Sequence, residues 1–227
     1  KKLNLKAPQY LNSGSYGHAF RVGNDMVLKI TTDISEVNSS FKTLRHGPPK
    51  HLAEIYKIYK IVDTGENKSF YVILQEYIPD RPKELFDKYN NVVDTIEPNG
   101  LDSFSIMKKM RKNADYNEIL EDIKKILTDN PEANITQNDR EGAYNYMLGL
   151  LEIHQELINF GIKSDDYTNT NNLGYKNGAL RYFDVGSIRM EAEPNMAQQD
   201  IVYLPEDGSS KFSTDNEMGQ DGFPPYS

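Results

Sequence analysis

The Asn177-Gly178 pair is the feature that most constrains how this sequence folds. It separates two short runs that carry apolar residues, LGYK and ALRYF. Both central residues of a two-residue hairpin turn adopt positive φ, which Asn and Gly tolerate better than other residues. The sequence therefore predicts an antiparallel hairpin over residues 173–183, preceded by a polar loop and by the end of an amphipathic helix.

Acidic side chains lie on both sides of this hairpin. Asp166 is in the polar loop, Asn171 follows it, and Asp184 comes directly after the second strand. Because the folded hairpin brings the loop close to Asp184, we expect three oxygen ligands to converge. Oxygen ligands of this kind bind hard cations such as Mg²⁺. The pattern is typical of a phosphoryl-transfer site.

The same residues resemble the catalytic core of the protein kinase superfamily. Asp166 and Asn171 match the catalytic-loop pattern D-x-x-x-x-N, and residues 183–186 (FDVG) resemble the D-F-G motif with Val in place of Phe. The resemblance implies that Asp166 orients the acceptor hydroxyl and accepts its proton, while Asn171 and Asp184 hold two Mg²⁺ ions. Asn172, which directly precedes the first hairpin strand, is an alternative metal ligand to Asn171.

The N-terminal third of the chain predicts a sheet with one helix. Residues 8–31 favour three short antiparallel strands, and residues 33–45 favour a helix capped by Asp33. Residues 53–63 and 69–78 favour two further strands. A five-stranded antiparallel sheet with one helix is the composition of a kinase N-lobe.

A glycine-containing turn in this region resembles the kinase loop that covers the phosphates of ATP. The resemblance implies that the phosphates are bound by the backbone groups of Gly14, Ser15, Tyr16 and Gly17. Glycine is needed where the backbone approaches a phosphate without a Cβ in the way. An ordinary glycine-containing hairpin is the alternative interpretation.

Two charged residues and a hinge complete the implied ATP site. Lys29 lies in an apolar strand that resembles V-A-I-K, so it would hold the α- and β-phosphates, with Glu36 as its partner. Backbone groups near Glu76 and Ile78 would bind adenine, with Gln75 as the gatekeeper. The alternatives are a Lys29 on a solvated face and a Glu36 that is only a surface charge.

The remainder of the chain predicts helices and then an acidic tail. Residues 82–160 favour helices, and a long one over residues 139–160 ends at Gly161. Residues 190–227 are acidic and polar, with residues 201–204 as their one clear apolar run. We expect this tail to dock on the helical lobe or on a neighbouring subunit through its aromatic residues, Phe212, Phe223 and Tyr226.

Composition excludes several classes of protein. The net charge of −8 argues against binding to nucleic acid or to an anionic membrane. The absence of Cys excludes disulfides and thiolate metal sites and suits a reducing compartment, so we expect a cytoplasmic protein. No apolar run approaches the roughly 18 residues of a membrane span.

Several residues depart from the kinase pattern. Ser164-Asp165 stands where His-Arg usually precedes the catalytic Asp, and Thr168 replaces the Lys that binds the γ-phosphate in Ser/Thr kinases. No A-P-E motif follows Gly186, so we expect a reduced C-lobe. These departures leave a pseudokinase, or a structural binding module without catalysis, as an alternative to an active enzyme.

The sequence as a whole predicts an α+β, protein kinase-like two-lobe fold. The N-lobe covers residues 1–78, a mainly helical C-lobe covers residues 79–189, and the acidic tail covers residues 190–227. The expected cofactors are ATP and Mg²⁺. The expected function is phosphoryl transfer to a hydroxyl group, with Ser or Thr of a protein as the leading acceptor and a small molecule, as in aminoglycoside or choline kinases, as the alternative. Self-association, or docking of a partner through the tail, is a further expectation.

Overall fold

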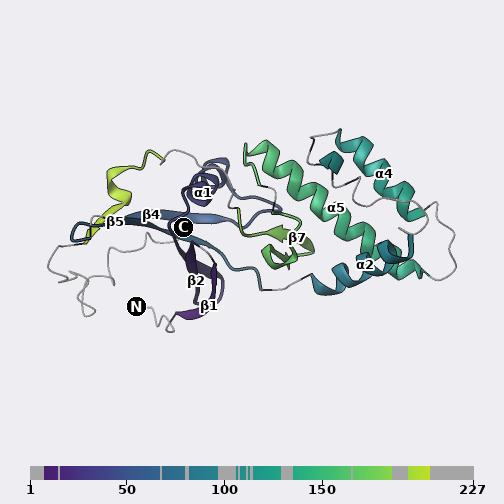
Figure 1. Ribbon diagram of the computed structural model, residues 1–227, viewed down its shortest axis with the longest axis horizontal. Helices are drawn as coiled ribbons and strands as arrows, with labels where there is room; N and C mark the ends of the chain where they lie inside the picture. The colour runs from purple at the N-terminus through teal and green to yellow at the C-terminus, as the bar shows by residue number, and fades with distance from the viewer. Residues whose placement is uncertain are drawn as a thin grey trace. The chain divides into compact units, whose positions relative to one another are not determined.

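The computed structural model describes residues 8–14, 16–66, 68–79, 82–96, 106, 108–110, 112, 115–128, 135–164, 166–185 and 194–204. Over these residues the protein is of mixed α+β class, as predicted, and it forms two compact units (Figure 1). The sheet unit comprises Lys1–Asn38, Ile55–Tyr77 and Glu191–Ser227, and the helical unit comprises Ser39–Glu54 and Ile78–Met190. None of the described helices is long and apolar enough to cross a membrane.

The sheet unit contains six strands in the spatial order β1-β2-β3-β5-β4-β8. Their bounds are β1 Gln9–Gly14, β2 Gly17–Val22, β3 Met26–Thr31, β4 Ile55–Asp63, β5 Lys68–Glu76 and β8 Ile201–Leu204. The first five pair with antiparallel neighbours, which confirms the five predicted strands. Helix α1 (Ile34–His46) follows β3, and the predicted cap at Asp33 is confirmed because its Oδ1 accepts a 2.8 Å hydrogen bond from Ser35 N.

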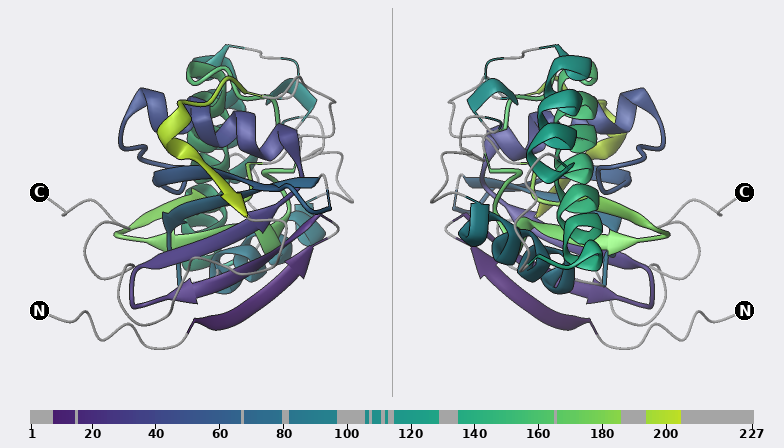
Figure 2. Two further views of the ribbon diagram at one scale, coloured as in Figure 1. Left: turned by 90° about the vertical axis from the view of Figure 1, so that its left-hand side faces the viewer. Right: turned by 90° about the vertical axis from the view of Figure 1, so that its right-hand side faces the viewer.

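Strand β8 corrects the prediction of a five-stranded sheet. It pairs in parallel with β4, with Lys60 opposite Ile201, and Figure 2 draws it in yellow beside the blue strand. Lys57 of β4 forms an ion pair with Asp200 just before β8 begins. The outer edge of β4 offers backbone groups for pairing, and the apolar run over residues 201–204 uses them.

Residues 201–204 of the tail therefore join the sheet unit. The expected docking of the tail on the helical lobe or on a neighbouring subunit stays a prediction. Outside the described residues lie the three proposed aromatic anchors of the tail, Phe212, Phe223 and Tyr226.

One face of the sheet is deeply buried. Ile58, Tyr71 and Ile73 have almost no exposed surface, and the pairing of β4 with β5 puts them on the same face. Lys29 of β3 is directly opposite Ile73, so its side chain lies on this buried face as well. A cation in such surroundings needs a partner.

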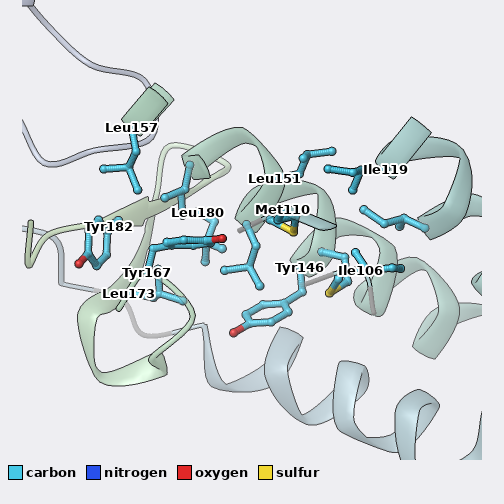
Figure 3. Close-up of a cluster of buried hydrophobic side chains, with 14 of the residues drawn as sticks. Ile106, Met110, Ile119, Tyr146, Leu151, Leu157, Tyr167, Leu173, Leu180 and Tyr182 are labelled. Atoms are coloured by element: carbon cyan, nitrogen blue, oxygen red, sulfur yellow. The ribbon is translucent and has the colours of Figure 1, made fainter. Parts of the chain in front are cut away.

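The main described elements of the helical unit are α2 (Lys83–Ile96), α4 (Tyr116–Thr128), α5 (Gln137–Asn159), β6 (Leu173–Lys176) and β7 (Ala179–Tyr182). Figure 3 shows side chains from several of them in one apolar cluster, including Ile119 of α4, Tyr146 and Leu151 of α5, and Leu180 of β7. This cluster is the core on which the loop between α5 and β6 is built.

Helix α5 lies at the centre of the unit. Thr136 caps its N-terminus by accepting a hydrogen bond from Asp139 N, and the helix ends before Gly161, whose φ of 65° confirms the predicted C-terminal glycine. Ile158, in the last turn of the helix, is 40% exposed.

The predicted hairpin of β6 and β7 is confirmed. Asn177 and Gly178 have φ values of 53° and 78°, and the two strands pair in antiparallel fashion on either side of them. The hairpin packs closely on α5, since a Cβ on Gly149 would lie 2.8 Å from Cβ of Leu180. This close approach fixes β7, the strand that leads to Asp184, against the central helix.

Candidate functional site

The turn between β1 and β2 carries the residues predicted to bind phosphate. Gly14 is paired with Gly17 at the ends of the two strands, and Ser15 lies outside the described residues. Tyr16 is 66% exposed, while its carbonyl oxygen accepts a 3.0 Å hydrogen bond from Thr32 N. The exposed turn is therefore attached to the chain just after β3.

Gly17 has a structural role that the sequence did not indicate. A Cβ at this position would lie 2.0 Å from the backbone oxygen of Ile30 on the neighbouring strand β3. No side chain fits there without displacement of the strand. The glycine is required by the sheet itself, whether or not a phosphate approaches it.

Lys29 and Glu36 are brought together as predicted. Nζ of Lys29 contacts Oε1 of Glu36, which lies in the first turn of α1. Glu36 is only 7% exposed, so it is not a surface charge, and Lys29 is not on a solvated face. Because both groups are largely withdrawn from water, their attraction is stronger than that of an exposed pair.

The predicted hinge residues are buried. Gln75 and Glu76 lie at the end of β5, where Glu76 is opposite Met26 of β3. The backbone continues to Tyr77, whose N–H donates a 2.7 Å hydrogen bond to the carbonyl oxygen of Asp25. Ile78 is also buried and is the first residue of the returning chain in the helical unit.

In the helical unit, the loop after α5 holds Asp166 from three sides. Its N–H donates to Oγ of Ser164 at 3.4 Å, and its carbonyl oxygen accepts from Asn169 N at 3.0 Å. Its carboxylate oxygen Oδ2 accepts a 3.2 Å hydrogen bond from Nδ2 of Asn172. The carboxylate is otherwise exposed, as an acceptor of a substrate proton needs to be.

Asn171 and Asn172 occupy different environments. Asn172 is 8% exposed and contacts Asp166, whereas Asn171 is exposed, and its backbone N–H donates to Oδ1 of Asn169. Asn169 caps the short 3₁₀ turn Thr170–Asn172, which contains both asparagines. The structure brings Asn172, and not Asn171, to Asp166.

Asp184 follows β7 and is half-buried. The preceding residue, Phe183, donates its N–H to the carbonyl oxygen of Asn172 at 3.1 Å. This hydrogen bond joins the chain next to Asp184 to the residue that contacts Asp166. A backbone hydrogen bond therefore links the segment that carries Asn172 to the segment that carries Asp184.

Tyr167 anchors the loop from the other side. It is 1% exposed, and Figure 3 shows it within the apolar cluster near Leu173 and Leu180. Its ring lies 5.3 Å from that of His154 on α5, measured between centroids. An inward Tyr167 next to an exposed Asp166 turns the carboxylate away from the core.

The donor chemistry of Asp166, Asn172 and Asp184 fits a hard divalent cation. Two carboxylates and one amide supply oxygen atoms, which are the ligands that Mg²⁺ prefers. Within the described ranges, no group of three or more His, Asp or Glu side chains is placed so that it could hold a metal ion. The roles of these residues stay predictions.

In comparisons with known proteins, no family model matches this chain, and no curated protein matches it either. The resemblance to protein kinases therefore depends on the motifs and on the local geometry described above.

Proposed function

We propose that this protein is a kinase that transfers the γ-phosphoryl group of ATP, with Mg²⁺, to a hydroxyl group. Ser and Thr side chains of a protein are the proposed acceptors. Residues of the sheet unit bind the phosphates of the nucleotide. Residues of the helical unit bind the metal and orient the acceptor.

The ion pair between Lys29 and Glu36 is the observation that carries this proposal. An ion pair of this kind is costly to bury and does not by itself stabilise a fold, so it points to a role beyond packing. Glu36 holds the ammonium group of Lys29 at one place on the central strand β3. A cation fixed in this way is what binding of the α- and β-phosphates requires.

The proposed reaction assigns one role to each polar residue of the helical unit. Asp166 accepts the proton of the acceptor hydroxyl while the hydroxyl oxygen attacks the γ-phosphorus. The bond between the γ-phosphorus and the bridging oxygen breaks, and ADP leaves. Asn172 and Asp184 would hold Mg²⁺, which supplies positive charge to the phosphate oxygens.

A small-molecule alcohol is the second proposed class of acceptor. After Val185 the described chain resumes at residue 194, and its residues 201–204 form β8 of the sheet unit. In protein kinases the chain after the D-F-G motif forms the activation segment up to A-P-E. Here residues 201–204 form a strand of the sheet. A small-molecule acceptor, which needs no activation segment for its binding, is therefore the alternative to a protein acceptor.

Transfer of labelled phosphate from γ-labelled ATP tests the proposal. Wild-type protein with Mg²⁺ is incubated with general protein acceptors and with a set of amino sugars and amino alcohols. The variant Asp166→Asn should lower transfer by at least about 100-fold, because proton acceptance is lost. The matched control is Asp87→Asn, since Asp87 is exposed on α2.

Two results would contradict the proposal. If wild-type protein binds ATP but labels no acceptor, the chain is a non-catalytic nucleotide-binding module. If Asp166→Asn and Asp87→Asn transfer phosphate equally well, Asp166 has no role in proton transfer.

A further inference from the structure

A pair of hydroxyl groups connects the Asp166 loop to strand β7. Oγ of Ser164 lies 2.7 Å from the hydroxyl oxygen of Tyr182, so the two form a hydrogen bond. Ser164 also accepts the N–H of Asp166. The contact therefore connects the strand, through one serine, to the backbone of Asp166, the proposed catalytic residue.

Tyr182 is held in place by burial and by two backbone hydrogen bonds. Its side chain has 0% exposure within the apolar cluster, where Figure 3 shows its ring beside Leu173 and Tyr167. Its backbone N–H donates to the carbonyl oxygen of His51, and its carbonyl oxygen accepts from Ala53 N at 2.9 Å. The hydroxyl of Tyr182 is thus a fixed point in the helical unit.

The far end of the same loop is attached to the next residue of β7. The carbonyl oxygen of Asn172 accepts the N–H of Phe183 at 3.1 Å. The loop over residues 164–172 is consequently fastened at its start to Tyr182 and at its end to Phe183. Asp184 is the residue that follows these two attachment points.

We propose that Ser164 and Tyr182 are positioning residues that set the place of Asp166 relative to Asp184. This inference rests on the proposed kinase function. The attachment through Phe183 is made by backbone atoms and survives substitution, whereas the attachment through Ser164 and Tyr182 depends on two hydroxyl groups. The hydrogen bond between Ser164 and Tyr182 is therefore the attachment that substitution can remove.

The hydroxyl pair also gives a role to a departure from the kinase pattern. Ser164 stands where the resemblance expects His, two residues before the catalytic Asp. Removal of either hydroxyl leaves the other in a poorly hydrated place without this partner, which is costlier than replacing both groups. Misplacement of a reacting group by about 1 Å lowers a rate by about 100-fold.

Three variants isolate the hydrogen bond. Tyr182→Phe removes one oxygen and keeps the ring, Ser164→Ala removes the other oxygen, and Ser164→Thr keeps a hydroxyl at the same place. The matched control is Tyr175→Phe on strand β6 of the same hairpin. The hydroxyl of Tyr175 donates to the carbonyl oxygen of Gly178 at 2.9 Å, so its hydrogen bond lies within the hairpin itself.

Amide hydrogen exchange measures the loop directly and requires no turnover. We expect Tyr182→Phe and Ser164→Ala to speed exchange in residues 164–172 by about 3- to 10-fold, the factor for one lost hydrogen bond. Tyr175→Phe should leave exchange in this loop unchanged, and Ser164→Thr should restore it. Exchange in the loop of Tyr182→Phe that equals that of Tyr175→Phe would overturn the inference.

Kinetics provide the second readout. Tyr182→Phe and Ser164→Ala should lower kcat by about 10- to 100-fold while KM for ATP stays within about twofold, because the acceptor side alone is misplaced. Partial unfolding of a variant also lowers its apparent kcat, in proportion to the fraction of molecules that are unfolded. The kcat of each variant is therefore divided by its folded fraction. Equal kcat per folded molecule in Tyr182→Phe and Tyr175→Phe contradicts the positioning role. If wild-type protein shows no turnover, the kinase proposal fails, and hydrogen exchange alone decides whether the loop is positioned.

Discussion

Nδ2 of Asn172 lies 3.2 Å from Oδ2 of Asp166, and this contact distinguishes two neighbouring asparagines. Asn171 has the spacing from Asp166 that the kinase pattern requires, but it is exposed. The spacing rule and the structure therefore select different residues. Geometry decides which amide reaches the carboxylate.

Separate substitutions of the two asparagines should differ in their effect on metal use. We expect Asn172→Ala to weaken Mg²⁺ activation by about 10-fold or more, since it removes a proposed ligand and the partner of Asp166. Asn171→Ala serves as the matched control and should change it little. Titration of phosphate transfer, or of ATP-dependent stabilisation, with Mg²⁺ measures both. The opposite ranking would return the role to Asn171.

Nucleotide binding should depend on Lys29. Millimolar Mg-ATP should raise the melting temperature of the wild-type protein by linkage, and Lys29→Met should remove most of that rise. Lys68→Met is the control, because Lys68 lies on β5 of the same sheet and its pair with Glu66 is exposed. The measurement is a thermal melt of each variant with and without Mg-ATP. Equal shifts in all three proteins would exclude Lys29 from the phosphate site.

Gly17→Ala should destabilise the protein even without nucleotide. The added Cβ would lie 2.0 Å from the carbonyl oxygen of Ile30, so β2 and β3 must separate. We expect a loss of about 1–3 kcal/mol in the free energy of unfolding, as for other overpacked sites. Urea unfolding without ATP measures it. An unchanged free energy together with lost ATP binding would assign this glycine to the phosphate alone.

Acid should weaken the fold through His154. Burial lowers the pKa of this imidazole below its ordinary 6.5, although a backbone hydrogen bond with Met110 acts in the opposite direction. The unfolded chain therefore takes up a proton below pH 6.5 that the folded protein resists. Stability from this group is present above pH 6.5 and is lost as the pH falls towards the lower pKa of the folded state.

Replacement of His154 should remove this part of the acid sensitivity. Between pH 7 and pH 5 the wild-type protein should lose more of its free energy of unfolding than His154→Phe, which keeps a ring against Tyr167. His46→Phe is the control, because His46 is exposed and stacks on Phe160. Unfolding free energies at the two pH values provide the comparison. Parallel losses in wild type and His154→Phe would show that His154 is not responsible.

Two deletions separate the roles of the tail. Deletion of residues 194–227 removes β8 and the ion pair of Lys57 with Asp200, so it should lower the melting temperature by about 2–4 °C for each kcal/mol lost. Deletion of residues 206–227 keeps β8 and tests the expected docking of the aromatic residues. A change in melting temperature or in oligomeric mass supports docking. If this shorter deletion matches the full chain in both measurements, the last residues do not dock.

Local patterns were sufficient for the parts of the structure that depend on neighbouring residues. Asn177-Gly178 identified the hairpin because turn geometry is local, and the cap at Asp33 was recognisable for the same reason. The Lys29–Glu36 partnership was also anticipated, because Glu36 lies in the first turn of α1 and this helix follows β3 closely in the chain.

Other features depend on distant residues or on orientation. Parallel pairing of β8 with β4 joins segments far apart in the chain, and no periodicity identifies such a partner. The choice of Asn172 over Asn171 depends on the 3₁₀ turn capped by Asn169, which residue counting does not contain. The contact of Ser164 with Tyr182 likewise joins two unremarkable hydroxyl residues that only the hairpin brings together.

The parallel pairing of β8 has a consequence for synthesis on the ribosome. Strands β1 to β5 are translated long before β8, so the outer edge of β4 stays unpaired while the helical unit is synthesised. An unpaired edge is open to association with other nascent chains. The Lys residues at positions 57 and 60 of β4 discourage such contacts until the last strand emerges, and a delay in translation between β5 and β8 should therefore increase co-translational aggregation.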